Sequence, residues 1–199
     1  MHLGNYGAKL IKEKKELVNF YSNKKVLITG HTGFKGGWLT LFLKMMGAQV
    51  FGVSHERKNL SSASGFSSVL VDHEVLTDIN NVDLYKKDIK NFEPDLVFYL
   101  AAQPLVREAF KKPVETFKTN VMGLTNFLNL IKDLKSIKLI LTVTSDKVYE
   151  QNKNSKKFVE TDRLGGVEPY GVSKAMQEMV VKTFYESYFQ FSDTKMLSV

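Results

Sequence analysis

The stretch KVLITGHTGFKG, residues 25–36, decides the fold of this 199-residue chain. Its first half is apolar and β-branched and predicts a strand over residues 25–29, after which glycines follow at 30, 33 and 36. Glycine allows a tight turn and close approach of a phosphate to the backbone, and the free N–H groups of a helix N-terminus attract that phosphate. We expect this helix over Trp38–Met46, closed by Gly47. The pattern predicts the phosphate-binding loop of a dinucleotide-binding fold.

Outward from this loop, short β-branched runs alternate with longer stretches of helical period. This alternation predicts an α/β protein with a doubly wound parallel sheet, the three-layer Rossmann fold. We expect a serine-rich loop over residues 59–68. The further strands are expected at Gln49–Val53, Leu96–Leu100, Lys138–Val143 and Lys195–Val199, and the further helices at Val114–Leu134 and from Tyr170 to Phe189. The first of these helices should bury Val114, Phe117, Val121, Leu124, Leu128 and Ile131 on one face.

The two ends of the chain differ from its middle. Residues 1–22 are rich in Lys and Glu and are interpreted as an N-terminal extension, and residues 23–199 as one dinucleotide-binding domain. The chain stops inside an expected strand. We therefore expect a domain truncated at its C-terminal end, without its substrate-binding part.

Composition narrows the class of protein. With 43% hydrophobic and 25% charged residues the chain suits an ordinary globular domain, and the lack of cysteine removes disulfides and thiolate zinc sites and suits the cytoplasm. The longest apolar stretch is interrupted by Lys44 and Gln49, so no membrane span is expected. The net charge of +7 comes from scattered lysines without interleaved aromatics, which favours an anionic nucleotide over nucleic acid as the partner. We expect no metal site.

The motif Tyr-x-x-x-Lys occurs three times, but only Tyr170 and Lys174 fall at i and i+4 of one expected helix. There the lysine ammonium should lower the pKa of the phenol and make it a base for a hydroxyl proton. Ser145, at the end of an expected strand, supplies a hydroxyl partner, and Asp146 and Lys147 add an acid/base pair. The other two matches are Tyr21 with Lys25, which opens a strand, and Tyr149 with Lys153, which runs into a polar segment.

The end of the second strand leaves the choice of cofactor open. The dinucleotide fold usually carries an acidic residue there for the adenosine ribose, but this chain has Ser54, followed by His55-Glu56-Arg57-Lys58. Arg57 or Lys58 could accept the 2′-phosphate of NADP, or the segment could be an exposed loop of mixed charge.

Five segments of the chain resemble the CDP-glucose 4,6-dehydratases, a family of extended short-chain dehydrogenases. They are the glycine loop TGHTGFKG and the segments LAAQPLVR, PVETFKTNVMG, VTSDKVYE and DRLGGVEPYGVSK. The resemblance implies NAD that is reduced and reoxidised within one turnover, a nucleotide-sugar substrate, Tyr170 as base and Asp146 as acid. Related dTDP-glucose dehydratases carry Glu where this chain has Lys147, so the base that acts at C5 of the sugar stays open. The resemblance also implies a homo-oligomer at full length.

The loop, the motif and the resemblance together define the expected site. Asn120, within the long expected helix, could equally be a structural hydrogen-bonding residue. Rival interpretations are a GDP-mannose or dTDP-glucose dehydratase, a 4-epimerase, or a silent dinucleotide-binding module. For residues 1–199 alone we expect negligible dehydratase activity and weakened NAD binding. The expected catalytic residues are Ser145, Asp146, Lys147, Tyr170 and Lys174; the expected cofactor residues are Gly30, Thr32, Gly33, Phe34, Lys35, Gly36, Ser54, Asp78, Ile79, Leu100, Ala101, Ala102, Thr119, Tyr170 and Lys174; and Gln103 and Ser145 are expected near the sugar.

Overall fold

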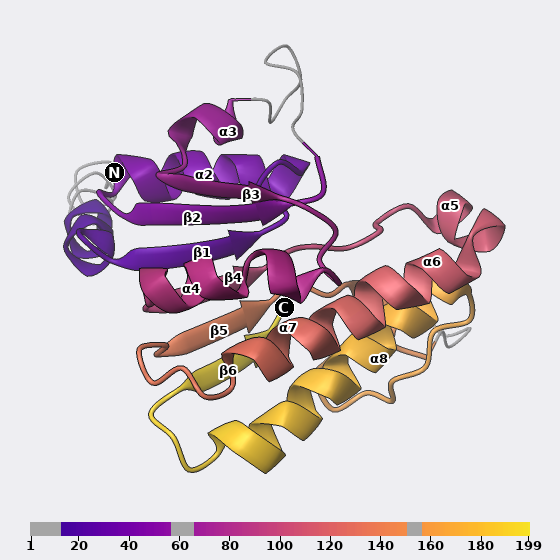
Figure 1. The fold of residues 1–199 in the computed structure, drawn as a ribbon. Coiled ribbons are helices and arrows are strands. Elements are labelled where there is room, and N and C mark those ends of the chain that lie inside the picture. Colours follow the sequence, from indigo (N-terminus) through magenta and orange to yellow (C-terminus); the bar gives the residue numbers. More distant parts are fainter. Residues whose placement is uncertain (1–12, 57–65, 151–156) are drawn as a thin grey trace, which may run out of the picture.

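Alternation of strands and helices produces a six-stranded sheet, which confirms the predicted fold class. The computed structural model describes residues 13–56, 66–150 and 157–199. All neighbouring strands are parallel, in the order β3-β2-β1-β4-β5-β6, with β1 at the centre (Figure 1). The strands are β1 (Lys25–Thr29), β2 (Gln49–Ser54), β3 (His73–Leu76), β4 (Leu96–Tyr99), β5 (Leu139–Thr142) and β6 (Lys195–Ser198).

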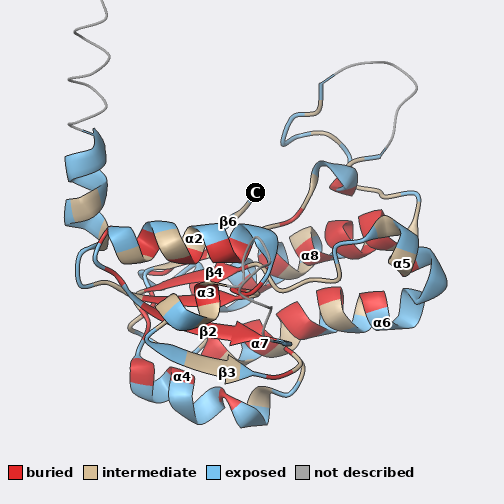
Figure 2. Cartoon of the chain, turned by 90° about the horizontal axis from the view of Figure 1, so that it is seen from above, coloured by how far each residue is buried: buried red, intermediate tan, exposed pale blue. Residues whose placement is uncertain are grey.

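Helices cover both faces of this sheet and give three layers. The longer ones are α2 (Phe34–Met45), α4 (Lys86–Phe92), α7 (Gly123–Ile131) and α8 (Pro169–Phe184), and the short ones are α3 (Ser67–Leu70), α5 (Val106–Lys111) and α6 (Pro113–Phe117). Strand β1 shows why both faces are apolar: Val26 and Ile28 pack beneath α2, whereas Leu27 packs against the α4, α7 and α8 side. Burial is accordingly concentrated on the strands and on the helix sides that face them (Figure 2).

The first helix begins earlier than predicted. It starts at Phe34, directly after Gly33, rather than at Trp38, so Lys35 and Gly36 belong to its first turn. The sequence prediction placed the glycines outside the helix because glycine is a poor helix former. Close packing of Gly36 on the preceding turn outweighs that preference, since a Cβ there would lie 2.1 Å from the carbonyl oxygen of Gly30.

The helix predicted over Val114–Leu134 is interrupted by a wider turn. Residues Lys118–Met122 form a π-helical stretch between α6 and α7, and a second such stretch, Tyr185–Phe189, follows α8. The extra residue in the turn rotates the apolar face, so Val114 is 79% exposed rather than part of the core. Phe117 is only partly buried, and the other residues of the stripe are buried as predicted: Val121, Leu124, Leu128 and Ile131.

Strand β3 was missed because it lies at the sheet edge and carries His73 and Glu74 in a pattern without an apolar run. The serine-rich loop was wrong at its end, where Ser67–Leu70 form α3, and its remainder falls in residues 57–65, outside the described part. Arg57, Lys58 and Lys153 lie outside the described part as well. In the described portion of the predicted N-terminal extension, residues 13–22, residues 13–21 are helical and Ser22 lies in a turn.

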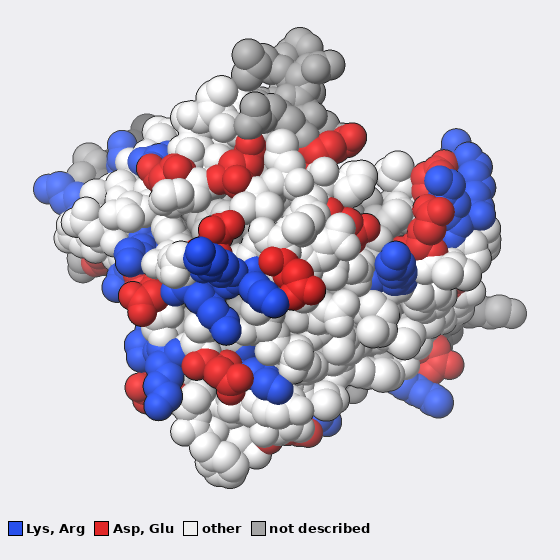
Figure 3. Space-filling model, in the orientation of Figure 1, with Lys and Arg blue, Asp and Glu red and all other residues white. Residues whose placement is uncertain are grey.

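The surface carries charges of both signs. On the face shown in Figure 3, acidic and basic side chains are interspersed rather than gathered by sign. Within residues 13–56, 66–150 and 157–199, no helix combines the length and apolar character needed to cross a membrane.

Candidate active site

A cavity of about 970 Å³ opens at the carboxyl ends of the parallel strands, within the size range of ligand sites. It lies where the strand order reverses, between β1 and β4, which is the position at which open α/β sheets bind ligands. The sequence-predicted residues that line it are Gly30, Thr32, Gly33, Phe34, Lys35, Gly36, Ser54, Asp78, Ile79, Leu100, Ala101, Ala102, Gln103, Thr119, Tyr170 and Lys174.

The glycine loop forms the floor of this cavity. Gly30 has a φ of +76°, which other residues rarely adopt, and a Cβ on it would lie 3.0 Å from the backbone nitrogen of Ala101. Its neighbour Thr29 fixes the same junction, since its Oγ1 accepts hydrogen bonds of 3.1 Å from the N–H groups of Leu100 and Ala101. The loop and the end of β4 therefore approach each other at backbone distance, and the cradle fits a phosphate chain.

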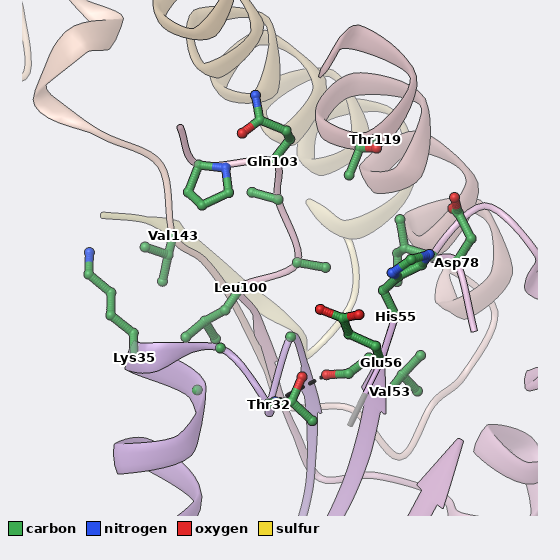
Figure 4. A pocket seen from close by; sticks show the side chains of 18 of the residues that line it. Thr32, Lys35, Val53, His55, Glu56, Asp78, Leu100, Gln103, Thr119 and Val143 are labelled. Atoms are coloured by element: carbon green, nitrogen blue, oxygen red, sulfur yellow. Dashed lines mark hydrogen bonds between the residues drawn. The ribbon is translucent and has the colours of Figure 1, made fainter. Parts of the chain in front are cut away.

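The two ends of the cavity differ in charge. Lys35 lies at one end, and Asp78, His55 and Glu56 lie at the other (Figure 4). Desolvation, the largest single influence, raises the pKa of Asp78, but hydrogen bonds from Asn80 and the charges of Lys118 and His55 together hold that pKa below its usual value. The carboxylate at this end therefore stays ionised at neutral pH.

Helix α8 brings Tyr170 and Lys174 to the cavity wall, one turn apart. The helix begins at Pro169 because Glu168 caps it: the carboxylate accepts 2.8 Å hydrogen bonds from the N–H groups of Tyr170 and Gly171. Lys174 is 3% exposed and donates to the carbonyl of Val143 and to Gln177 Oε1. Burial lowers the pKa of Lys174 to about 8, and the charge of Lys35 adds to the shift.

Asn120, in the π-helical stretch, anchors a buried network behind Tyr170. Its Oδ1 accepts from the Gln103 N–H at 2.7 Å, and its Nδ2 donates to Ser173 Oγ at 2.8 Å. Ser173 in turn donates to the carbonyl oxygen of Tyr170. Asn120 is fully buried, and it makes the structural hydrogen bonds that the sequence analysis allowed for it.

The turn Ser145-Asp146-Lys147 lies beside the cavity rather than in its lining. The cavity wall runs to Val143 and Thr144, and the next residues form a 3₁₀ turn in which Ser145 Oγ accepts from the Lys147 N–H. Asp146 and Lys147 are exposed. The structure therefore brings together only Tyr170 and Lys174 of the five expected catalytic residues.

Sequence reasoning missed several residues that line the cavity. His55 and Glu56 follow Ser54 directly and were treated as loop, and the others had no motif to mark them. The position of His55 and Glu56 could have indicated a role, since the residues after the second strand face the ligand in this fold. The missed residues are Val53, His55, Glu56, Thr77, Pro104, Glu115, Lys118, Val143 and Thr144. In the described part of the chain, no group of three or more His, Asp or Glu side chains could hold a metal ion.

These features define a dinucleotide-binding domain of the short-chain dehydrogenase type, with a glycine cradle and a Tyr/Lys pair at one cavity. The chain belongs to the GDP-mannose 4,6 dehydratase family, which it matches over residues 27–198. It is 38% identical to CDP-glucose 4,6-dehydratase of Salmonella typhimurium over 86% of this chain and 48% of that protein, and 30% identical to GDP-mannose 4,6-dehydratase of Vibrio cholerae over 85% and 48%. The chain thus spans about half the length of these curated relatives.

A solved structure shows the same fold. UDP-glucose 4-epimerase from Brucella ovis in complex with NAD matches with a TM-score of 0.75 and 19% identity, over 88% of this chain and 50% of that one.

Proposed function

We propose that this chain is the cofactor-binding and catalytic part of a CDP-glucose 4,6-dehydratase, which converts CDP-glucose to CDP-4-keto-6-deoxyglucose and water. The observation that carries the proposal is the opening of Tyr170 and Lys174 into the cavity whose floor is the glycine loop. A base beside a dinucleotide cradle suits removal of a hydroxyl proton as hydride leaves the same carbon. The 38% identity to the Salmonella enzyme supports CDP-glucose as the substrate.

NAD fits the cavity by its glycine cradle and by the charge difference between its ends. Gly30 and Gly36 leave the backbone open to a pyrophosphate, with Lys35 beside it, and Asp78 lies at the opposite end. A structure of the same fold, the Brucella epimerase, contains NAD. NAD held there would supply reversible hydride transfer, out of C4 of the sugar and back to C6, so no external oxidant would be consumed.

In the first half of the reaction, Tyr170 takes the proton of the C4 hydroxyl. Lys174, one turn along the helix, supports the phenolate through its charge, and Ser145 forms a hydrogen bond with the same hydroxyl. The Glu168 cap and the Asn120 network hold the first turn of α8, so the phenol has a fixed position.

In the second half, the C4 ketone acidifies the hydrogen at C5, and Asp146 protonates the departing C6 hydroxyl, which leaves as water. Lys147, beside Asp146, either acts as a neutral amine that takes the C5 proton, or acts as a cation that stabilises the enolate while another group takes that proton. This pair separates a dehydratase from a 4-epimerase, which has no water to expel. Asp146 and Lys147 are exposed beside the cavity, and this role requires the sugar to lie across the cavity mouth.

A turnover assay tests the proposal. CDP-glucose and NAD are incubated with the chain alone and with the chain joined to the C-terminal half of the Salmonella relative, and the 4-keto-6-deoxy product is measured. We expect turnover by the joined protein and negligible turnover by residues 1–199 alone, because binding energy from the nucleotide is needed to position the sugar. Turnover of dTDP-glucose or GDP-mannose in preference to CDP-glucose would move the proposal to a sister enzyme. Epimerised product without loss of water would overturn it.

A further inference from the structure

A hydrogen-bonded chain runs from the cavity wall into the core behind the glycine loop. Ser54 Oγ, at the end of β2, accepts from the Thr32 N–H at 3.2 Å and lies 2.9 Å from His31 Nδ1. On the other side of the ring, His31 Nε2 lies 2.9 Å from Glu74 Oε1 on β3. The bond at Thr32 is the dashed line in Figure 4.

The sheet is built around this histidine. His31 is fully buried, and it occupies space that a side chain on β2 would need, since a Cβ at Gly52 would lie 2.5 Å from its Nδ1. In a neutral imidazole ring one nitrogen donates and the other accepts. Because the carboxylate of Glu74 can only accept, Nε2 carries the proton and Nδ1 is the acceptor.

The direction of the chain then determines what Ser54 offers the cavity. Its hydroxyl proton points to His31 Nδ1, and one of its two acceptor positions is taken by the Thr32 N–H. The remaining acceptor position is available to a ligand, and Ser54 lines the cavity. Glu74 thereby fixes the tautomer and orientation of the ring, as the acid of a Ser-His-acid array does, and through the ring it fixes the direction of the Ser54 hydroxyl.

We propose that His31 and Glu74 orient Ser54 as a hydrogen-bond acceptor for the ribose 2′-hydroxyl, so that the three residues replace the acidic residue usual at this position and select NAD over NADP. A 2′-hydroxyl can donate to Ser54, whereas a 2′-phosphate has only acceptor oxygens and meets an acceptor. His31 and Glu74 are positioning residues that act through Ser54. This inference rests on the proposed function, since it needs a dinucleotide in the cavity.

Calorimetric titration of the chain with NAD and with NADP tests the inference through the ratio of the two dissociation constants. Ser54→Ala removes the acceptor, and His31→Phe removes the partner that orients it, so both should lower the preference for NAD by about three- to tenfold. Glu74→Leu frees the ring to take the other tautomer and should lower the preference by a similar factor. Glu74→Gln keeps an acceptor for Nε2 and should retain the wild-type preference.

His73→Phe is the matched control, because His73 is exposed on the same strand and does not line the cavity. If His31→Phe does not fold, the contrast between Glu74→Leu and Glu74→Gln decides. An unchanged ratio in Ser54→Ala, or equal ratios in the two Glu74 variants, would overturn the inference while leaving the proposed function intact. A wild-type chain that binds neither dinucleotide would overturn both.

Discussion

The glycine cradle and the turn Ser145-Asp146-Lys147 lie at the same edge of one sheet but are built differently. Around the cradle, Gly30, Thr29 and Ser54 are fixed by backbone-distance packing and buried hydrogen bonds. In the turn, Asp146 and Lys147 are exposed, and the hydrogen bonds of Ser145 are to its own neighbours. The cradle is thus prearranged in this chain, whereas the proposed acid and base, Asp146 and Lys147, have no comparable set of buried contacts among the described residues.

Tyr170→Phe and Asp146→Asn separate the two regions most sharply. In the joined protein, Tyr170→Phe should lower hydride transfer by about 10³-fold or more, since the phenol is the group proposed to take the C4 hydroxyl proton, while NAD binding stays. Asp146→Asn should permit oxidation at C4 and block loss of water. Reduced cofactor is followed by absorbance and product by mass. Full dehydration by Asp146→Asn would show that the exposed turn is not the acid.

Gly36→Ala tests whether the cradle is as rigid as its packing indicates. The new Cβ would lie 2.1 Å from the carbonyl oxygen of Gly30, so the loop must shift and NAD binding should weaken by about 100-fold. Gly165→Ala is the matched control, because its Cβ would meet only ordinary contacts at 3.5 Å or more. Calorimetric titration measures both. Equal affinities in the two variants would mean that the loop yields easily.

Burial of Lys174 in the cavity wall makes the stability of the fold depend on pH. Its pKa falls from 10.5 to about 8 on folding, so the folded state binds fewer protons than the unfolded state between these values. Burial of the charge therefore costs stability below pH 8, and the cost is relieved as pH rises toward 10.5. Relative to Lys174→Met, the free energy of unfolding should rise by about 3 kcal/mol across this window.

Urea unfolding at pH 7, 9 and 10.5 measures the effect of Lys174. Lys182→Met, at an exposed lysine of the same helix, is the control and should show no such trend. A wild-type stability that falls relative to Lys174→Met over this range would contradict the expected sign.

Glu168→Ala gives the smallest expected change. Losing the cap of α8 leaves two N–H groups without their carboxylate and should lower the free energy of unfolding by about 1 kcal/mol. Since the cap holds the turn that carries Tyr170, turnover in the joined protein should fall further than dinucleotide binding does. Glu160→Ala, at an exposed site, is the control. Equal losses in both variants would show that the cap is dispensable.

The sequence was most informative where one kind of residue has one physical use. The apolar runs identified five of the six strands, and the glycine spacing located the turn of the cradle, because only glycine suits a φ of +76° there. The sequence did not predict local structure that depends on tertiary contacts. Strand β3 is short and polar, and its His73 and Glu74 join the sheet through pairing with β2. The wide turn at Asn120 and the burial of Lys174 depend on neighbours from distant segments.

The sequence predicted the positions of some site residues and not of others. Placement in the cavity could be anticipated for Tyr170 and Lys174 from their spacing, because i and i+4 share a helix face. The position of Asp146 could not, because a strand end specifies which edge a residue reaches but not which way the following turn runs. The burial of His31 could not be predicted either, because a polar residue within a glycine loop is expected to be exposed. Its ring fits in the core only because Gly52 has no side chain there.

The strand order also determines when, during synthesis of the chain, the glycine cradle can form. Strand β1 pairs with β2 through Val26 and Val50, but its other edge waits for Leu96 of β4. Every pairing in the sheet is parallel and joins segments distant in sequence, which slows folding relative to hairpins of similar size. A nascent chain would therefore expose the apolar β1 on one edge until β4 has left the ribosome, and a chaperone that recognises extended apolar segments has its target in that interval.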